Sequence, residues 1–262
     1  FNERKYQLQY MFNSLQLNNG NGTFSNIAAM AGVLKSDWSW AALFSDFNLD
    51  GFKDYYVCNG FRRYSRDNDF MIAMGKTREE NNGKIPMEKR TELYNMMPEI
   101  KLNNKLYIND GNLHFNDNDE SFSHPKLSTY SYGVAQGDFD NDGDMDLIVS
   151  NIDQPVLFLK NNARERTNNN YLKVSLDETS VPKKQYSKIR IFYGDEQQLQ
   201  EYSFVRGYES TMQECLNFGL SDVSKIDKLT IEWPDGNLQT LTNIDVNQHL
   251  KIKYKKEKNI TE

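Results

Sequence analysis

The fold of this chain is decided by the acidic stretch Asp138-Phe139-Asp140-Asn141-Asp142-Gly143-Asp144-Met145-Asp146, which runs directly into the apolar residues Leu147-Ile148-Val149. Oxygen-bearing side chains occupy positions 1, 3, 5 and 9, and glycine occupies position 6. Calcium takes about six to eight oxygen ligands, and a glycine at position 6 allows the sharp turn that wraps alternate side chains around one ion. The pattern therefore predicts a calcium-binding loop that opens onto a strand.

The predicted ligands of this loop are the side chains of Asp138, Asp140, Asp142 and Asp146 and the main-chain carbonyl of Asp144. An EF-hand carries a bidentate Glu at position 12, where this chain has Val149 at the end of an apolar, β-branched run. The loop is therefore not an EF-hand. A single copy would leave open a second interpretation, an acidic solvated turn between two strands, since Asp and Asn are common turn residues.

A second copy of the pattern occurs earlier in the chain, as Asp46-Phe47-Asn48-Leu49-Asp50-Gly51-Phe52-Lys53-Asp54 followed by Tyr55-Tyr56-Val57. Its predicted ligands are the side chains of Asp46, Asn48, Asp50 and Asp54 and the carbonyl of Phe52. We therefore predict two calcium sites. The later loop holds five Asp, whereas the earlier one holds three Asp, one Asn and the opposing Lys53, so the later loop is expected to bind calcium more tightly.

The two loops belong to a longer internal repeat. Residues 15–24 align with 106–115 as hairpins with Asn/Gly turns, and residues 38–42 align with 130–134 directly before the loops. The repeat contains roughly four strands, which is typical of a β-propeller blade. Its 92-residue spacing exceeds one blade because residues 61–103 form an insertion, which is expected to hold two short helices, the second running into Pro98.

The rest of the chain changes character after residue 162. Residues 155–162 echo the start of the repeat a third time, residues 163–170 are a polar linker, residues 171–254 alternate with the period of strands, and 255–262 form a tail. The predicted fold is all-β. Residues 1–162 form the C-terminal blades of a partial β-propeller with a helical insertion, and a small antiparallel β-sandwich follows.

The paired loops and their flanking strands resemble the FG-GAP/VCBS repeats of integrin-alpha-like propellers, with residues 132–147 as one motif and its cation loop. The C-terminal region is similar to the ASPIC/UnbV family. The residues that carry this second resemblance are Arg206-Gly207-Tyr208, Leu216 to Ser221, Val223 to Leu229, Trp233-Pro234-Asp235-Gly236 and Thr240 to Ile244.

The order of the two regions resembles proteins of the cartilage-acidic-protein type and their bacterial repeat-containing relatives. This resemblance implies an exported or surface-attached protein with a seven-bladed propeller, and it implies no known activity. Lys183 to Ser187 depart from the family pattern, which usually has a glycine-containing segment there.

Composition narrows the classes of partner. The formal net charge of −6 and the pI near 5.3 argue against a general nucleic-acid binder. No segment has the length of a transmembrane helix.

Because the first residues already read as part of a repeat, we expect a C-terminal piece of a longer protein. An extracellular, periplasmic or cell-surface location is then expected, with any export signal in the preceding part. Cys58 and Cys215 are expected to be buried, with a disulfide left open.

The sequence contains no catalytic constellation. Its three histidines, His114, His124 and His249, sit in unrelated contexts, and phosphate-loop or nucleophile-elbow motifs are absent. Trp38 and Trp40 are expected to share one face of a strand, where a role in the propeller core or between blades is favoured over a sugar-stacking shelf. We therefore expect a non-catalytic, calcium-stabilised binding or scaffold module that recognises a protein or glycan partner. The alternative is an enzyme or enzyme subunit whose active site lies in the insertion or in the N-terminal blades.

Overall fold

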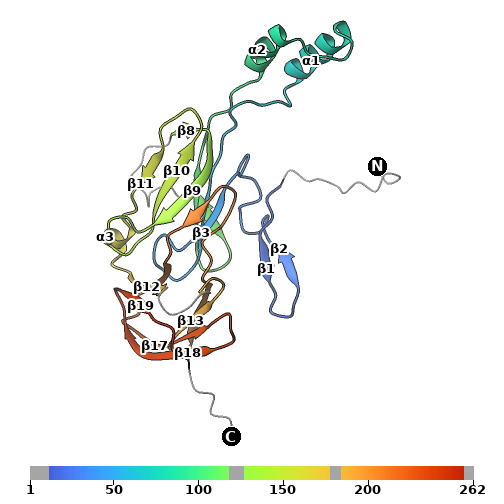
Figure 1. Ribbon diagram of the computed structural model, residues 1–262. Coiled ribbons are helices and arrows are strands. Elements are labelled where there is room, and N and C mark those ends of the chain that lie inside the picture. Colours follow the sequence, from blue (N-terminus) through green and yellow to red (C-terminus); the bar gives the residue numbers. More distant parts are fainter. Residues whose placement is uncertain (1–11, 118–126, 178–183, 257–262) are drawn as a thin grey trace.

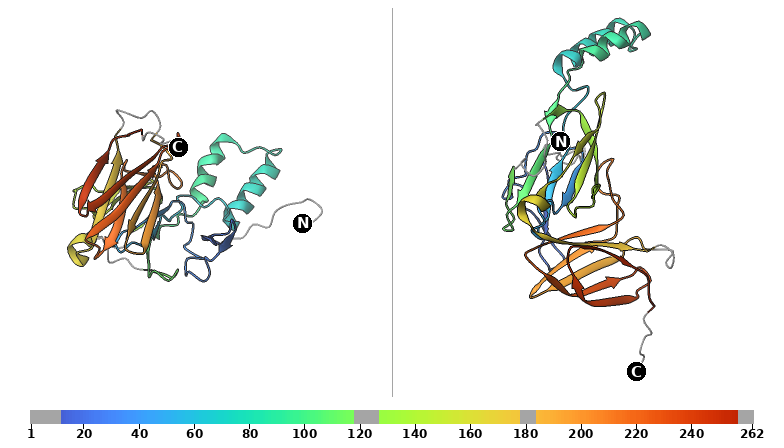
Figure 2. Two further views of the ribbon diagram at one scale, coloured as in Figure 1. Left: turned by 90° about the horizontal axis from the view of Figure 1, so that it is seen from below. Right: turned by 90° about the vertical axis from the view of Figure 1, so that its left-hand side faces the viewer.

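The structure is a computed structural model that describes residues 12–117, 127–177 and 184–256. The molecule is elongated, with a pair of helices at one end, two four-stranded sheets in the middle and a two-sheet sandwich at the other end (Figures 1 and 2). Strands far outnumber helices, which confirms the all-β prediction. The first predicted hairpin, β1 (Gln16–Asn18) and β2 (Phe24–Asn26), forms a sheet of its own.

The first blade is an antiparallel sheet in the order β3-β4-β6-β7. Its strands are β3 (Ala42–Ser45), β4 (Asp54–Val57), β6 (Lys105–Asn109) and β7 (Phe115–Asp117). Tyr55 and Tyr107 lie opposite each other on neighbouring strands, with ring centroids 5.6 Å apart. Such aromatic pairs stabilise a sheet beyond the area that they bury. The chain leaves this blade between β4 and β6 to form the insertion.

The second blade, in the order β11-β10-β9-β15, matches the first in three strands, but its fourth strand lies beside β9, whereas β7 lies beside β6. Its strands are β9 (Ser131–Gly137), β10 (Asp146–Asn151), β11 (Leu157–Leu159) and β15 (Thr211–Met212). Strands β9, β10 and β11 correspond to β3, β4 and β6, so the third echo of the repeat completes this blade. The fourth strand, β15, comes from the C-terminal region and runs parallel to β9. The sequence did not predict this strand.

The insertion holds the two predicted helices, α1 (Asn68–Glu80) and α2 (Met87–Met96). The Asp67 side chain caps α1 by accepting a hydrogen bond from Phe70 N at 3.0 Å. The insertion is tied to the blades where β5 (Leu102–Asn103) pairs with β8 (Ser128–Thr129). Each helix buries a single side chain, Phe70 or Leu93, and the pair projects away from the sheets (Figure 1).

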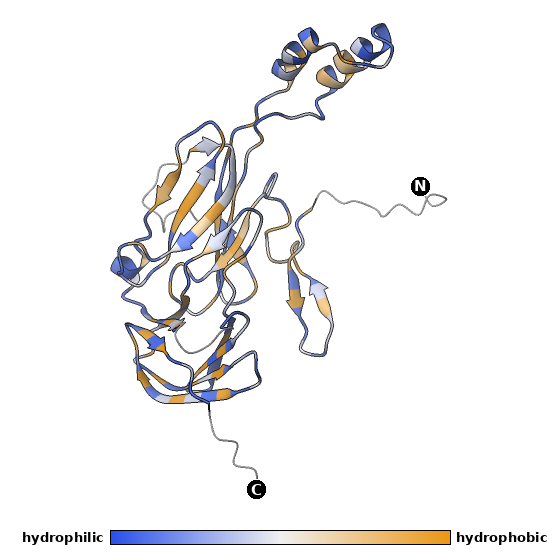
Figure 3. Ribbon diagram, viewed as in Figure 1, coloured by the Kyte–Doolittle hydropathy of each residue, from blue (hydrophilic) through white to orange (hydrophobic). Residues whose placement is uncertain are grey.

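The C-terminal region is a sandwich of two sheets with orders β16-β12-β19 and β14-β13-β17-β18, as predicted. Apolar and polar residues alternate along its strands (Figure 3), and the fully buried Trp233 lies in its core. The strands are β12 (Asn170–Leu176), β13 (Lys188–Tyr193), β14 (Glu196–Glu201), β16 (Leu216–Ser221), β17 (Lys225–Glu232), β18 (Leu238–Asp245) and β19 (Gln248–Ile252).

One pair of strands in the sandwich departs from the antiparallel prediction. Strand β19 runs parallel to β12. The chain crosses from one sheet to the other after β18, so β19 does not return alongside its sequence neighbour and is free of the hairpin constraint. Upstream, the predicted polar linker 163–170 contains the short helix α3 (Ala163–Thr167), which ends at Asn168 in the left-handed conformation (φ 56°).

Trp38 and Trp40 lie in the segment before β3, so the prediction that they share one face of a strand is wrong. Trp40 packs against the second blade. Its ring lies 4.7 Å from that of Tyr132 on β9, and the Trp40 Nε1–H donates to Gly60 O at 2.7 Å. Both cysteines, Cys58 and Cys215, are buried and free, which confirms the expectation of burial and leaves no disulfide between them.

The contact between the C-terminal region and β9 can be tested at Gly133. A Cβ there would lie 2.2 Å from the carbonyl oxygen of Glu209, so backbone would have to move. We expect Gly133→Ala to lower the free energy of unfolding by about 1–3 kcal/mol, as overpacking does. The matched control is Gly75→Ala in α1, where a Cβ meets nothing within 4 Å. It should raise stability by about 0.5–1 kcal/mol.

Urea unfolding of both variants provides the measurement. A Gly133→Ala protein as stable as the parent chain would show that the segment before β15 does not lie against β9.

Candidate metal centre

The two acidic loops occupy equivalent places in the two blades. Loop 1 (residues 46–54) joins β3 to β4, and loop 2 (residues 138–146) joins β9 to β10. In loop 1 the Asp54 carboxylate accepts hydrogen bonds from Phe47 N at 2.8 Å and from Asn109 N at 3.0 Å. Position 9 of each loop therefore has a structural role, because the same carboxylate closes the loop and holds the strand that follows.

Loop 2 repeats this arrangement around Asp146. Its carboxylate accepts from Phe139 N at 3.0 Å and from Asn161 N at 2.8 Å. Asp54 and Asp146 are both fully buried. Each of the two carboxylates accepts one N–H group from its own loop and one from beyond the next strand. The sequence repeat is therefore also a repeat of this hydrogen-bond pattern.

Glycine is required at position 6 of both loops. Gly51 and Gly143 have φ values of 98° and 106°, a region that residues with a Cβ rarely adopt. Their N–H groups donate to the position 1 carboxylates, Asp46 at 2.8 Å and Asp138 at 3.1 Å. A Cβ on Gly143 would also lie 2.0 Å from the ring of Tyr171.

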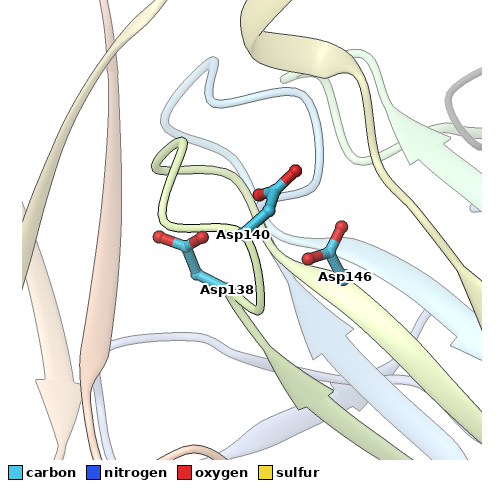
Figure 4. Close-up of side chains that lie close together, drawn as sticks. All are labelled: Asp138, Asp140 and Asp146. Atoms are coloured by element: carbon cyan, nitrogen blue, oxygen red, sulfur yellow. The ribbon is translucent and has the colours of Figure 1, made fainter.

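Loop 2 brings three of its predicted ligands together. Asp138, Asp140 and Asp146 each offer an oxygen, and these oxygens all lie within 4.8 Å of one another (Figure 4). Among the described residues, three buried carboxylate oxygens of this loop have no hydrogen-bond partner: Asp138 Oδ1, Asp142 Oδ2 and Asp144 Oδ1. Buried acceptors without partners are costly, and a hard cation would satisfy them. The donor set of loop 2 therefore fits calcium.

Loop 1 is arranged differently. Asp46 accepts from Asp50 N at 3.0 Å as well as from Gly51 N, and the Asn48 amide donates to Asp50 Oδ2 at 2.8 Å. The Asp46 and Asp50 carboxylates are thus satisfied by N–H groups of the loop itself. Among the described residues, only the loop 2 carboxylates form a clustered ligand group. The calcium ion in loop 1 and the role of the Phe52 carbonyl as its ligand both stay predictions.

Burial disfavours charge in both loops. It raises the pKa of Asp46 to about 7 and that of Asp54 to about 8, and in loop 2 it raises the pKa of Asp144 to about 7. Burial also lowers the pKa of Lys53, against the opposing attraction of Asp46 and Asp54. Without a bound cation, burial therefore favours the protonated forms of Asp46, Asp54 and Asp144.

Two lysines from outside the loop neutralise part of the charge on loop 2. Lys173 on β12 forms a buried ion pair with Asp138 at 2.5 Å, where both side chains are nearly inaccessible. Lys160 forms a partly exposed ion pair with Asp140 at 2.8 Å. The sequence analysis missed Lys173, because an alternating strand gives no sign that one of its lysines reaches a loop in another sheet.

Both loops rest on the sandwich. In loop 2, Gly143 O accepts from the Asn217 amide at 3.0 Å; in loop 1, Leu49 O accepts from Ser221 N at 2.9 Å. A Cβ on Gly219 would lie 2.0 Å from Asp46 Oδ2. Sequence reasoning did not predict this contact, although a glycine inside a strand does indicate a close approach by another chain segment.

Comparison with known families supports both resemblances drawn from the sequence. Residues 99–149 match the model of the FG-GAP-like repeat, and residues 187–259 match the model of ASPIC and UnbV. The first match contains loop 2, whereas loop 1 lies outside both matched regions. No curated protein matches the chain. Within the described part, no helix has the length and apolar character needed to cross a membrane.

The raised carboxyl pKa values predict a pH effect in calcium-free protein. Unfolded Asp has a pKa of about 3.9, so groups with higher folded pKa values add stability below that pH and lose it as the pH rises through about 7. We therefore expect Asp46→Asn and Asp144→Asn to reduce the fall in melting temperature between about pH 5 and 8, relative to the parent protein in EDTA. Parallel melting curves across that range would contradict the expectation.

The buried ion pair predicts a strong effect of Lys173→Met. Removing the lysine leaves the Asp138 carboxylate buried and unpaired, which typically costs about 3–5 kcal/mol. Lys160→Met is the matched control, since its ion pair with Asp140 is partly exposed and such pairs contribute about 0–1 kcal/mol. Chemical unfolding in EDTA measures both. Equal losses in the two variants would contradict the assignment of Lys173 as the main internal cation of loop 2.

Proposed function

We propose that this chain is a calcium-stabilised, non-catalytic binding or scaffold module of an extracellular, periplasmic or cell-surface protein, and that it recognises a protein or glycan partner. FG-GAP-like repeats are typical of binding modules of this kind, and the chain combines one with an ASPIC and UnbV region. The family matches do not identify a bound ion or a class of partner. These two parts of the proposal rest on the contacts of loop 2 and on the cavity between the blades and the sandwich.

The observation that carries the calcium proposal is the cluster of oxygens from Asp138, Asp140 and Asp146 in loop 2, beside which the buried Asp138 Oδ1 and Asp142 Oδ2 have no partner among the described residues. Asp138, Asp140, Asp142 and Asp146 would supply side-chain oxygens, and the Asp144 carbonyl would complete the loop pattern. A bound ion would supply positive charge where burial now opposes ionisation, and so would stabilise the folded loop. Loop 1 would hold a second, weaker ion through the matching residues.

A structural ion also accounts for the position of the loops. Each loop lies between a blade and the sandwich, so an ion there would stiffen the junction of the two regions. A cation whose ligands all come from the protein leaves no open position for a substrate. The loops are therefore assigned to stability and not to catalysis.

The strongest sign of an enzyme within the described residues is the pair of Cys215 and His249, with the Cys215 Sγ and His249 Nε2 atoms 3.7 Å apart. An active thiolate needs a lowered cysteine pKa. Here burial raises the pKa of Cys215 to about 11 and lowers that of His249, so both groups stay neutral. His249 also bonds Ser175 Oγ at 2.8 Å. This pair favours packing over catalysis.

Calcium titration tests the stabilising ion. We expect calcium to raise the melting temperature and EDTA to lower it, with dissociation constants of about 10⁻⁴–10⁻³ M, as in other extracellular modules. A hundredfold excess over the dissociation constant would add about 2.7 kcal/mol to the free energy of unfolding. A melting temperature that does not respond to calcium or EDTA would contradict the proposal.

Two variants at position 5 separate the loops. In calorimetric titrations with calcium, Asp142→Ala should abolish the tighter binding site. Asp50→Ala should abolish the weaker site and leave the tighter one unchanged. The reverse assignment, or equal affinities, would contradict the predicted order. A glycan array and a pull-down with the full-length protein would then identify the class of partner.

A further inference from the structure

A cavity of about 450 Å³ lies between the blades and the sandwich, and none of the predicted calcium ligands lines it. Its blade side includes Phe44 and Ser45 of β3 and Gln136 of β9, and its sandwich side includes Leu199 of β14 and Asn217 of β16. Its size falls within the range of about 300–1,000 Å³ that is typical of small-molecule sites. Junctions between structural units are common places for such sites.

The charged residues around the cavity are mostly cationic. Lys188 and Arg206 line it, against the single carboxylate of Glu201. Lys53 also lines it, but burial opposes its charge and the acids Asp46 and Asp54 attract it. The Arg206 guanidinium donates from Nε to Ser203 O at 3.3 Å and from Nη2 to Glu201 O at 3.2 Å, which orients the group without neutralising it. Lys188 has only a long ion pair, 3.7 Å to Glu232. The cavity is thus suited to an anionic group.

The cavity also holds two buried acceptors without donors. Gln136 and Asn217 are 3 % and 8 % exposed, and neither Gln136 Oε1 nor Asn217 Oδ1 has a hydrogen-bond partner among the described residues. The Asn217 amide orientation is fixed, because its Nδ2 donates to Gly143 O, a carbonyl that can only accept. The other end of the Gln136 amide, Nε2, lies 2.5 Å from Ser45 Oγ. Buried acceptors of this kind need donors such as hydroxyl groups.

Apolar side chains form the rest of the wall. Phe44 and Leu199 line the cavity and are 41 % and 49 % exposed, so one side opens to solvent. A ligand that meets all three features carries an anionic group, several hydroxyl groups and an apolar C–H surface. Sugar acids combine these features.

We propose that this cavity binds a small acidic sugar, a hexuronate, with its carboxylate towards Arg206 and Lys188 and its hydroxyl groups donating to Gln136 and Asn217. The inference rests on the proposed binding role of the chain, and it narrows the partner to the glycan class. It does not depend on calcium. Inorganic phosphate lacks the ring of hydroxyl donors, and a neutral hexose lacks the anion, so each satisfies only part of the site.

The test is calorimetry and ligand-observed NMR on the full chain in EDTA, with D-galacturonate as the probe. D-galactose and inorganic phosphate serve as comparisons. Galacturonate should bind saturably and more tightly than either of them. Absence of saturable binding by galacturonate, or equal binding of galactose or phosphate, would overturn the proposal. A galacturonate trisaccharide that competes at the same site would indicate the end of an acidic polysaccharide as the source, whereas its exclusion would indicate the free sugar acid.

Charge variants locate the binding. Arg206→Gln should weaken galacturonate binding about tenfold or more, as loss of a charge-assisted hydrogen bond does. Lys188→Gln should weaken it less and mainly at low salt. Lys225→Gln is the control, because Lys225 matches Lys188 in exposure and in its long ion pair (3.8 Å to Asp245) but does not line the cavity. It should leave affinity unchanged.

The outcomes separate this inference from the calcium proposal. If galacturonate binds in EDTA while calcium fails to change the melting temperature, only the calcium proposal is wrong. If calcium stabilises the protein and galacturonate does not bind, only the assignment of the cavity is wrong. Should Arg206→Gln fail to fold, the comparison of Lys188→Gln with Lys225→Gln decides, and equal affinities in those two variants would overturn the proposal.

Discussion

The structure depends on two buried carboxylates, Asp54 and Asp146, each of which accepts backbone N–H groups from its own loop and from the next strand. Carboxylates that accept such bonds are the strong members of a hydrogen-bond network, and removing them would leave several buried donors unsatisfied. This interaction joins three consecutive strands of each blade. It also closes each acidic loop, and in loop 2 the closed loop brings oxygens of Asp138, Asp140 and Asp146 within 4.8 Å of one another.

The short-range sequence pattern of the two acidic loops predicted the repeated parts of the fold well. The spacing of oxygen side chains, the glycine at position 6 and the apolar residues that follow predicted both loops and the strands around them. The two helices of the insertion followed from ordinary signals such as Pro98. These features are determined by residues close together in the chain, which is why a single sequence was enough. The clustering of Asp138, Asp140 and Asp146 in loop 2, but not of the matching acids in loop 1, depends on packing that the pattern does not contain.

Long-range contacts could not be predicted in the same way. The parallel pairing of β19 with β12, and of β15 with β9, depends on where the chain crosses between sheets. Lys173 shows the physical reason most clearly. Its strand alternates, and lysine is seldom fully buried, yet it is 4 % exposed because the Asp138 carboxylate lies beside it. Each of these two charges makes the burial of the other tolerable, so neither position can be understood without its distant partner.

Asn217 connects the loop and the cavity. Its amide nitrogen donates to Gly143 O, at the turn of loop 2. The same residue lines the cavity, and its side-chain oxygen has no partner among the described residues. The orientation of that oxygen is therefore set by the position of the Gly143 carbonyl. Gly143 in turn is held by Asp138, one of the clustered carboxylates, through a 3.1 Å hydrogen bond. Loop 2, the junction of the two regions and the cavity are thus joined by one chain of hydrogen bonds.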